Sequence, residues 1–181
     1  MRQLKIALVL AVAVILQTSL PAVWPLIVYV DLPLIVVVYV ALQRDALQAL
    51  FVGAIAGLAT DALSGGLLGA GGFSKTLVAF LIVSLATRIN LDNPLARIPV
   101  LAGASLLDDG VYVLLHRMLG QPSNIGFVEQ ASFKLIGTAA AGTILLYLLD
   151  LVFSERASQR RQLAFRRRVA RRGIVKLGKR R

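Results

Sequence analysis

The feature that most constrains the fold of this chain is a series of long apolar runs. A helix needs about 20 mostly apolar residues to cross the hydrocarbon core of a bilayer, which is about 30 Å thick. Six runs approach or reach that length; they cover residues 5–20, 26–42, 46–63, 73–89, 95–119 and 133–153. The sequence therefore predicts an all-α integral membrane protein, a bundle of six transmembrane helices. Five spans remain an alternative if the first two runs do not both cross.

Composition supports a membrane protein and limits the chemistry of the chain. Of its 181 residues, 57% are hydrophobic and the mean hydropathy is +0.78, which is too apolar for an ordinary soluble domain. The chain has no cysteine, which excludes disulfides and thiolate metal sites. Its one histidine, His116, cannot form a multi-histidine metal site. No serine lies in the G-x-S-x-G turn that carries the nucleophile of many hydrolases. We therefore expect the chain to have no enzymatic activity and to bind no cofactor and no metal.

Charge divides the chain into two predicted parts. Residues 1–154 contain eight basic and eight acidic residues, whereas residues 155–181 contain twelve basic residues and Glu155, which supplies the whole net charge of +11. We therefore expect a six-helix transmembrane domain over 1–154 and a basic tail over 155–181.

The distribution of lysine and arginine predicts the orientation, because cytoplasmic loops are enriched in both. Six spans with both termini cytoplasmic place seventeen basic residues inside and three outside. The outer three are Lys75, Arg117 and Lys134. The N-terminal run lacks a signal-peptidase pattern, so we expect it to be an uncleaved helix.

The tail is the most basic segment of the chain. Phe165 and Val169 are spaced i, i+4 and could lie on a lipid surface. Because the tail follows a membrane span directly, anionic phospholipids are nearer partners than nucleic acid, and we expect no nucleic-acid binding. The residues expected to contact lipid are Arg160, Arg161, Arg166, Arg167, Arg168, Arg171 and Arg172.

Residues 53–76, GAIAGLATDALSGGLLGAGGFSKT, place a carboxylate beside a glycine-rich break. Gly53, Gly57 and Asp61 share one helix face, and small residues let membrane helices approach closely. The segment 69–76, GAGGFSKT, nearly matches a nucleotide-binding loop. It has serine at the second glycine position and follows an apolar helix instead of a strand, so a tight turn between helices is the favoured interpretation.

Five ionisable residues lie within apolar runs at similar outer depth, where a charge is expensive and marks a candidate site. A proton or substrate site is one interpretation, and a structural network of paired charges is favoured over it. Lys75 is placed to pair with Asp61. Neighbouring Asp108 and Asp109 point about 100° apart, so we expect them not to face the same partner. The expected network comprises Asp61, Lys75, Asp108, Asp109 and Lys134.

Residues 17–76 combine a glutamine near the end of the first helix, an aspartate–proline entry to the second, and a short charged turn. The pattern G-x-x-x-G-x-x-x-D-x-x-S-G-x-x-x-G follows. The positions of this pattern, which we expect to form a helix-packing or partner surface, are Gly53, Gly57, Asp61, Ser64, Gly65 and Gly69. In these features the segment resembles the bacterial rod shape-determining protein MreD family.

The resemblance implies a component of the bacterial inner membrane without enzymatic activity, acting as a scaffold of the machinery that elongates the cell by lateral peptidoglycan synthesis. It implies an MreC-like partner, a glycan polymerase and transpeptidase, and indirect association with the MreB filament. It also implies a fold similar to the substrate-binding subunits of energy-coupling-factor transporters. The alternative function is a small-molecule-binding membrane subunit of a transporter. A water-filled cavity around Asp61, Asp108 and Asp109, with polar groups converging on it, would favour a ligand. Closed packing with internal ion pairs would favour the scaffold.

Overall fold

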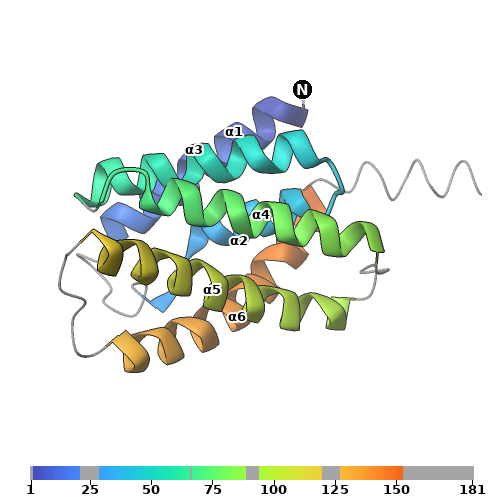
Figure 1. Ribbon diagram of the computed structural model, residues 1–181. Helices are drawn as coiled ribbons and strands as arrows, with labels where there is room; N and C mark the ends of the chain where they lie inside the picture. Colours follow the sequence, from blue (N-terminus) through green and yellow to red (C-terminus); the bar gives the residue numbers. More distant parts are fainter. Residues whose placement is uncertain (1, 21–28, 66, 89–93, 120–126, 153–181) are drawn as a thin grey trace, which may run out of the picture. The chain divides into compact units, whose positions relative to one another are not determined.

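The computed structural model describes residues 2–20, 29–65, 67–88, 94–119 and 127–152. Within these ranges every regular element is an α-helix, as the apolar runs predict. Six helices follow one another along the described part of the chain (Figure 1). They are α1 (Arg2–Ser19), α2 (Leu32–Ala41), α3 (Ala46–Ser64), α4 (Ala70–Arg88), α5 (Pro94–Met118) and α6 (Phe127–Val152).

Three helices in the described part of the chain are long and apolar enough to cross a membrane; they are α3, α4 and α5, the last from Ala96 onward. The second helix is shorter than the run over 26–42 predicts. Its ten residues extend about 15 Å, half of a bilayer core. The helix begins late because Asp31 caps it, its side chain accepting the Leu34 N–H, and because Pro33 lies in its first turn.

The helix α2 lies at the centre of the packing. Every residue from Pro33 to Ala41 is buried, and α2 contacts α1, α3, α4 and α5. A helix that is apolar on all sides is stable only when other helices cover it. The core of the fold is therefore built around α2.

The helices α3 and α4 form the closest pair and lie side by side in Figure 1. The Asp45 side chain caps α3 by accepting the Gln48 N–H, and Gly65 ends it with a left-handed φ of 66°. That conformation is costly for residues with a Cβ. The short turn returns the chain antiparallel onto the face of α3 that carries Gly53 and Gly57.

The outward face of α3 is apolar. Its large side chains recur at helical spacing and are between 44% and 71% exposed; they are Leu47, Phe51, Ile55 and Leu58. Soluble monomers rarely expose contiguous apolar patches of this kind. The face is suited to contact with lipid, in agreement with the apolar composition.

The contacts divide the chain into two units, residues 1–146 and residues 147–181. In the first unit α6 approaches the rest of the chain through small residues. A Cβ on Gly137 would meet the carbonyl of Tyr29, which precedes α2, and one on Gly142 would meet Leu101 of α5 and Ile35 of α2. Of the second unit the structure describes 147–152, the last turns of α6. The tail, with its seven candidate lipid-binding arginines and with Phe165 and Val169, lies outside the described residues.

Candidate functional site

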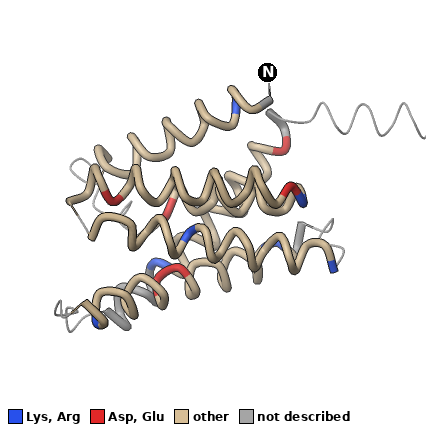
Figure 2. The backbone as a smooth tube through the Cα atoms, turned by 45° about the horizontal axis from the view of Figure 1, so that its top comes forward, with Lys and Arg blue, Asp and Glu red and all other residues tan. Residues whose placement is uncertain are grey.

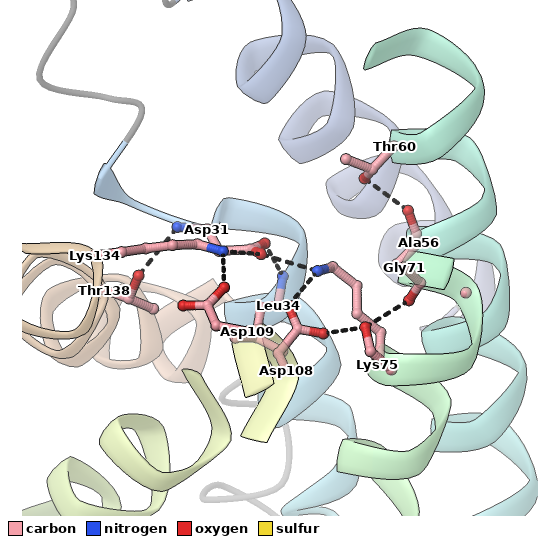
Figure 3. Close-up of polar contacts among 12 residues, drawn as sticks. Asp31, Leu34, Ala56, Thr60, Gly71, Lys75, Asp108, Asp109, Lys134 and Thr138 are labelled. Carbon is pink, nitrogen blue, oxygen red and sulfur yellow. Dashed lines mark hydrogen bonds and ion pairs between the residues drawn. The ribbon is translucent and has the colours of Figure 1, made fainter. Parts of the chain in front are cut away.

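Five charged side chains from four helices meet inside the first unit (Figure 3). They come from the N-cap of α2, the first turns of α4, the second half of α5 and the beginning of α6. In Figure 2 most of the backbone is tan, and red and blue segments come together in the interior. We call the five residues the charge chain because opposite charges alternate along it, in the order Asp108, Lys75, Asp31, Lys134 and Asp109.

Lys75 is the most enclosed cation of the charge chain. Its residue is 4% exposed, and its Nζ lies 2.9 Å from Asp31 Oδ2 and 2.8 Å from Asp108 Oδ2. Both distances are those of charge-assisted hydrogen bonds. Removing one partner of a buried ion pair leaves an uncompensated charge, so each of these groups depends on the others.

Asp31 joins three helices at the centre of the charge chain. Its Oδ1 accepts the Leu34 N–H at 2.9 Å, and its Oδ2 lies 3.6 Å from Lys134 Nζ in addition to Lys75. Its own N–H donates to Thr138 Oγ1 of α6 at 3.2 Å. The next residue, Leu32, donates its N–H to Gln17 Oε1 of α1 at 2.9 Å. The network expected from the sequence lacked Asp31, although an aspartate two residues before a proline at the start of an apolar run is an N-cap signature.

The neighbouring aspartates of α5 face different partners, as their 100° separation predicts. Asp108 accepts from Lys75 on Oδ2 and from the Ser74 hydroxyl on Oδ1. Asp109 accepts from Lys134 on Oδ1 at 2.5 Å. The structure thus brings together Lys75, Asp108, Asp109 and Lys134, four of the five residues expected to form a network.

The fifth residue, Asp61, lies apart from the charge chain, and the expected pair with Lys75 is not formed. Asp61 Oδ2 accepts the backbone N–H groups of Gly69 and Gly71 at 2.9 Å each and of Gly72 at 3.4 Å. The amides of Gly71 and Gly72 lie in the first turn of α4, and Gly69 directly precedes that helix. Free N–H groups and the helix dipole favour an anion there. The carboxylate therefore caps α4 from the end of α3.

This contact explains the near-match to a nucleotide-binding loop. Amide groups at a helix N-terminus bind phosphate in such loops, but here Asp61 of the same chain takes that place. The lysine of the motif, Lys75, is 4% exposed and bonded to two aspartates. The segment 69–76 is a turn and a helix start held by internal contacts, in agreement with the interpretation favoured from the sequence.

The six positions of the glycine pattern divide into two groups. A Cβ on Gly57 would overlap the Gly71 carbonyl, and one on Gly53 would lie 2.9 Å from the Lys75 carbonyl oxygen, so these two allow α3 and α4 to approach backbone to backbone. Ser64 is exposed, and nothing lies within 4 Å of a Cβ on Gly65 or Gly69, whose φ values are 66° and 99°. The later positions shape the turn and do not pack.

The remaining titratable ring of α5, His116, makes a local contact. Its Nδ1 lies 3.0 Å from the Tyr112 carbonyl oxygen and its ring centroid 4.3 Å from that of Tyr112. In the part of the chain that the structure describes, no group of three or more histidine, cysteine, aspartate or glutamate residues is arranged to hold a metal ion.

Comparison with known protein families gives a match over most of the chain. The sequence model of a family described as rod shape-determining protein MreD matches residues 1–154. No curated protein and no solved structure matches the chain. The family match covers all six helices and ends where the basic tail begins.

Proposed function

The chain belongs to the MreD family of rod shape-determining proteins, and from that premise we propose that it is a non-enzymatic scaffold of the cell-elongation machinery in the bacterial inner membrane. Its role in cell shape follows from the family. The finer proposal is that it holds together components that insert peptidoglycan along the lateral wall.

The proposed topology has six spans with both termini in the cytoplasm and an arrangement similar to the substrate-binding subunits of energy-coupling-factor transporters. The lysine and arginine distribution supports this orientation. In that orientation the charge chain lies in the outer half of the membrane, and the tail over 155–181 lies against anionic phospholipids of the inner leaflet.

The observation that carries the proposal is the closed packing of the ionisable groups within a chain of this family. Asp61 and Asp108 are 4% and 3% exposed, and each is bonded to groups of the protein itself. A ligand site has polar groups converging on a space that the ligand occupies. Carboxylates already held by a lysine, a serine and backbone amides are suited to fixing helices, which is what a scaffold requires.

We propose an MreC-like protein as the direct partner. The glycan polymerase and transpeptidase of the elongation complex are further partners, and the MreB filament is reached indirectly. The apolar outward face of α3 favours contact with a membrane-embedded segment, since it offers large side chains without charge. Association within lipid then depends on close packing of such faces.

Two experiments on the chain in its native membrane test the proposal. Depletion should turn rod-shaped cells into spheres, and re-expression should restore the rods. The tagged chain, solubilised in mild detergent, should co-purify with an MreC-like protein, whereas an unrelated six-span protein with the same tag should not. Co-purification with a small molecule and with transporter subunits, without elongation proteins, would instead establish the transporter alternative.

A further inference from the structure

The charge chain is not electrically balanced. Three carboxylates, Asp31, Asp108 and Asp109, face two ammonium groups, Lys75 and Lys134, which leaves a formal charge of −1. An uncompensated charge is costly in a buried site and costlier still inside a membrane.

The imbalance is located at Asp109. Asp31 has both lysines and a backbone donor, and the two oxygens of Asp108 accept from Lys75 and Ser74. Asp109 accepts from Lys134 on Oδ1, while its Oδ2 is buried and has no hydrogen-bond partner among the residues that the structure describes.

A second orphan group lies beside it. Ser105 is 0% exposed, and its Oγ is buried without a partner in the described structure. Ser105 precedes Asp109 by four residues, so the two lie one turn apart on the same face of α5. The excess charge and two unsatisfied polar atoms therefore coincide on one stretch of one helix.

We propose that Asp109 is a proton-binding site, with the proton carried on Oδ2. The proton removes the formal charge of the chain and changes Oδ2 from an acceptor into a donor. The structure shows no hydrogen bond between Oδ2 and the Ser105 hydroxyl one turn away. After protonation, rotation of the two side chains would let Oδ2 donate to that hydroxyl oxygen. One proton thus neutralises the excess charge, and with that rotation both unsatisfied oxygens gain a partner.

A proton fits this site better than a metal ion. Hard cations such as Ca²⁺ and Mg²⁺ need about six oxygen ligands, and the unpartnered oxygens here are one carboxylate oxygen and one hydroxyl. The Lys134 ammonium is bonded to the same carboxylate, and its positive charge repels a metal ion at this site. Its side chain is 25% exposed, against 6% for Lys75, so this end of the charge chain is the less enclosed one.

Protonation of Asp109 removes the uncompensated charge, while Asp31 remains as the carboxylate partner of Lys134. The folded form then binds more protons than the unfolded form, and stability rises as pH falls. The charged groups that act on Asp109 are Lys134 of α6, Asp108 of α5 and Asp31, the N-cap residue of α2.

The test is the Tm of the purified full-length chain in detergent at constant ionic strength. Between about pH 8 and about pH 5 the wild-type Tm should rise by about 2–4 °C. Asp109→Asn, which fixes a neutral group at the same place, should lose this rise. Asp45→Asn is the control, since Asp45 is an exposed N-cap that asparagine replaces well; it should follow the wild type.

Three outcomes would overturn the proposal. They are a wild-type Tm that does not change with pH, a Tm of Asp109→Asn that rises as the wild type's does, and a rise in Tm with Na⁺ at fixed pH that Asp109→Asn abolishes.

Infrared spectroscopy at neutral pH gives a second measurement should Asp109→Asn fold poorly. The wild type should show a carboxylic-acid C=O band that Ser105→Ala shifts by removing its hydrogen-bond acceptor. Absence of the band, or a band unmoved in Ser105→Ala, would also contradict the proposal.

Discussion

Two regions of this molecule bury carboxylates to nearly the same extent and neutralise them by different means. At the α3–α4 turn, Asp61 is held by backbone N–H groups of Gly69, Gly71 and Gly72. In the charge chain, Asp31 and Asp108 are held by the ammonium group of Lys75. The first region needs backbones in close approach, and the second needs side chains of opposite charge.

Substitutions should therefore destabilise the two regions for different reasons. The α3–α4 contact depends on the absence of a Cβ at Gly53 and Gly57 and should be sensitive to size. The charge chain joins α2, α4, α5 and α6 through long side chains and should be sensitive to charge. Substitutions that change one property at a time distinguish the two.

The largest effect is expected for Lys75→Met, which keeps much of the side-chain volume and removes the charge. Asp31 and Asp108 then lose their shared cation inside the protein, at a cost of about 3–5 kcal/mol in the free energy of unfolding. Arg88→Met, on the exposed last turn of the same helix, is the control and should change little. Thermal unfolding of both variants in detergent is the measurement; equal stability would mean that the charge chain does not stabilise the fold.

A smaller loss is expected for Gly57→Ala. A methyl group there overlaps the Gly71 backbone, so α3 must move away from α4, at a cost of about 1–3 kcal/mol. Gly103→Ala is the matched control in the middle of α5, where nothing lies within 4 Å of a Cβ. It should stabilise the helix by about 0.5–1 kcal/mol. The same unfolding assay should move in opposite directions for the two variants; a shared direction would show that the close approach is not the cause.

The smallest effects compare two serines near the turn. Ser74→Ala removes a buried donor to Asp108 and should cost about 1.5 kcal/mol. Ser64→Ala changes an exposed residue at the end of α3 and should stay within about 0.5 kcal/mol. If Ser64→Ala lowered the free energy of unfolding as much as Ser74→Ala, the exposed end of the glycine pattern would also contribute to packing.

Much of the fold follows from the sequence. The apolar runs predicted all six helices, and the i, i+4 spacing of Gly53 and Gly57 placed them on the face that α4 covers. The similar depth of Lys75, Asp108, Asp109 and Lys134 predicted a network that the structure brings together. Such features depend on periodicity and depth, and both can be read along one helix at a time.

The features that could not be predicted from the sequence depend on how the helices are placed and rotated relative to one another. Lys75 pairs with Asp31 and not with Asp61 because the rotation of α4 about its axis sets which carboxylate its side chain meets. The partners of Asp61 are backbone amides, which every residue has and no residue type marks. The short α2 was overestimated because apolar residues before Asp31 continue the pattern across the N-cap.

Two double-mutant cycles can show whether the buried charges form one chain from which Asp61 is separate. The cycles combine Lys75→Met with Asp108→Asn and, in parallel, with Asp61→Asn, and the free energy of unfolding of each protein is measured. We expect a coupling of about 1–3 kcal/mol between Lys75 and Asp108, and additivity within about 0.5 kcal/mol for Lys75 and Asp61. A coupling of Lys75 to Asp61 as large as its coupling to Asp108 would show that Asp61 belongs to the charge chain.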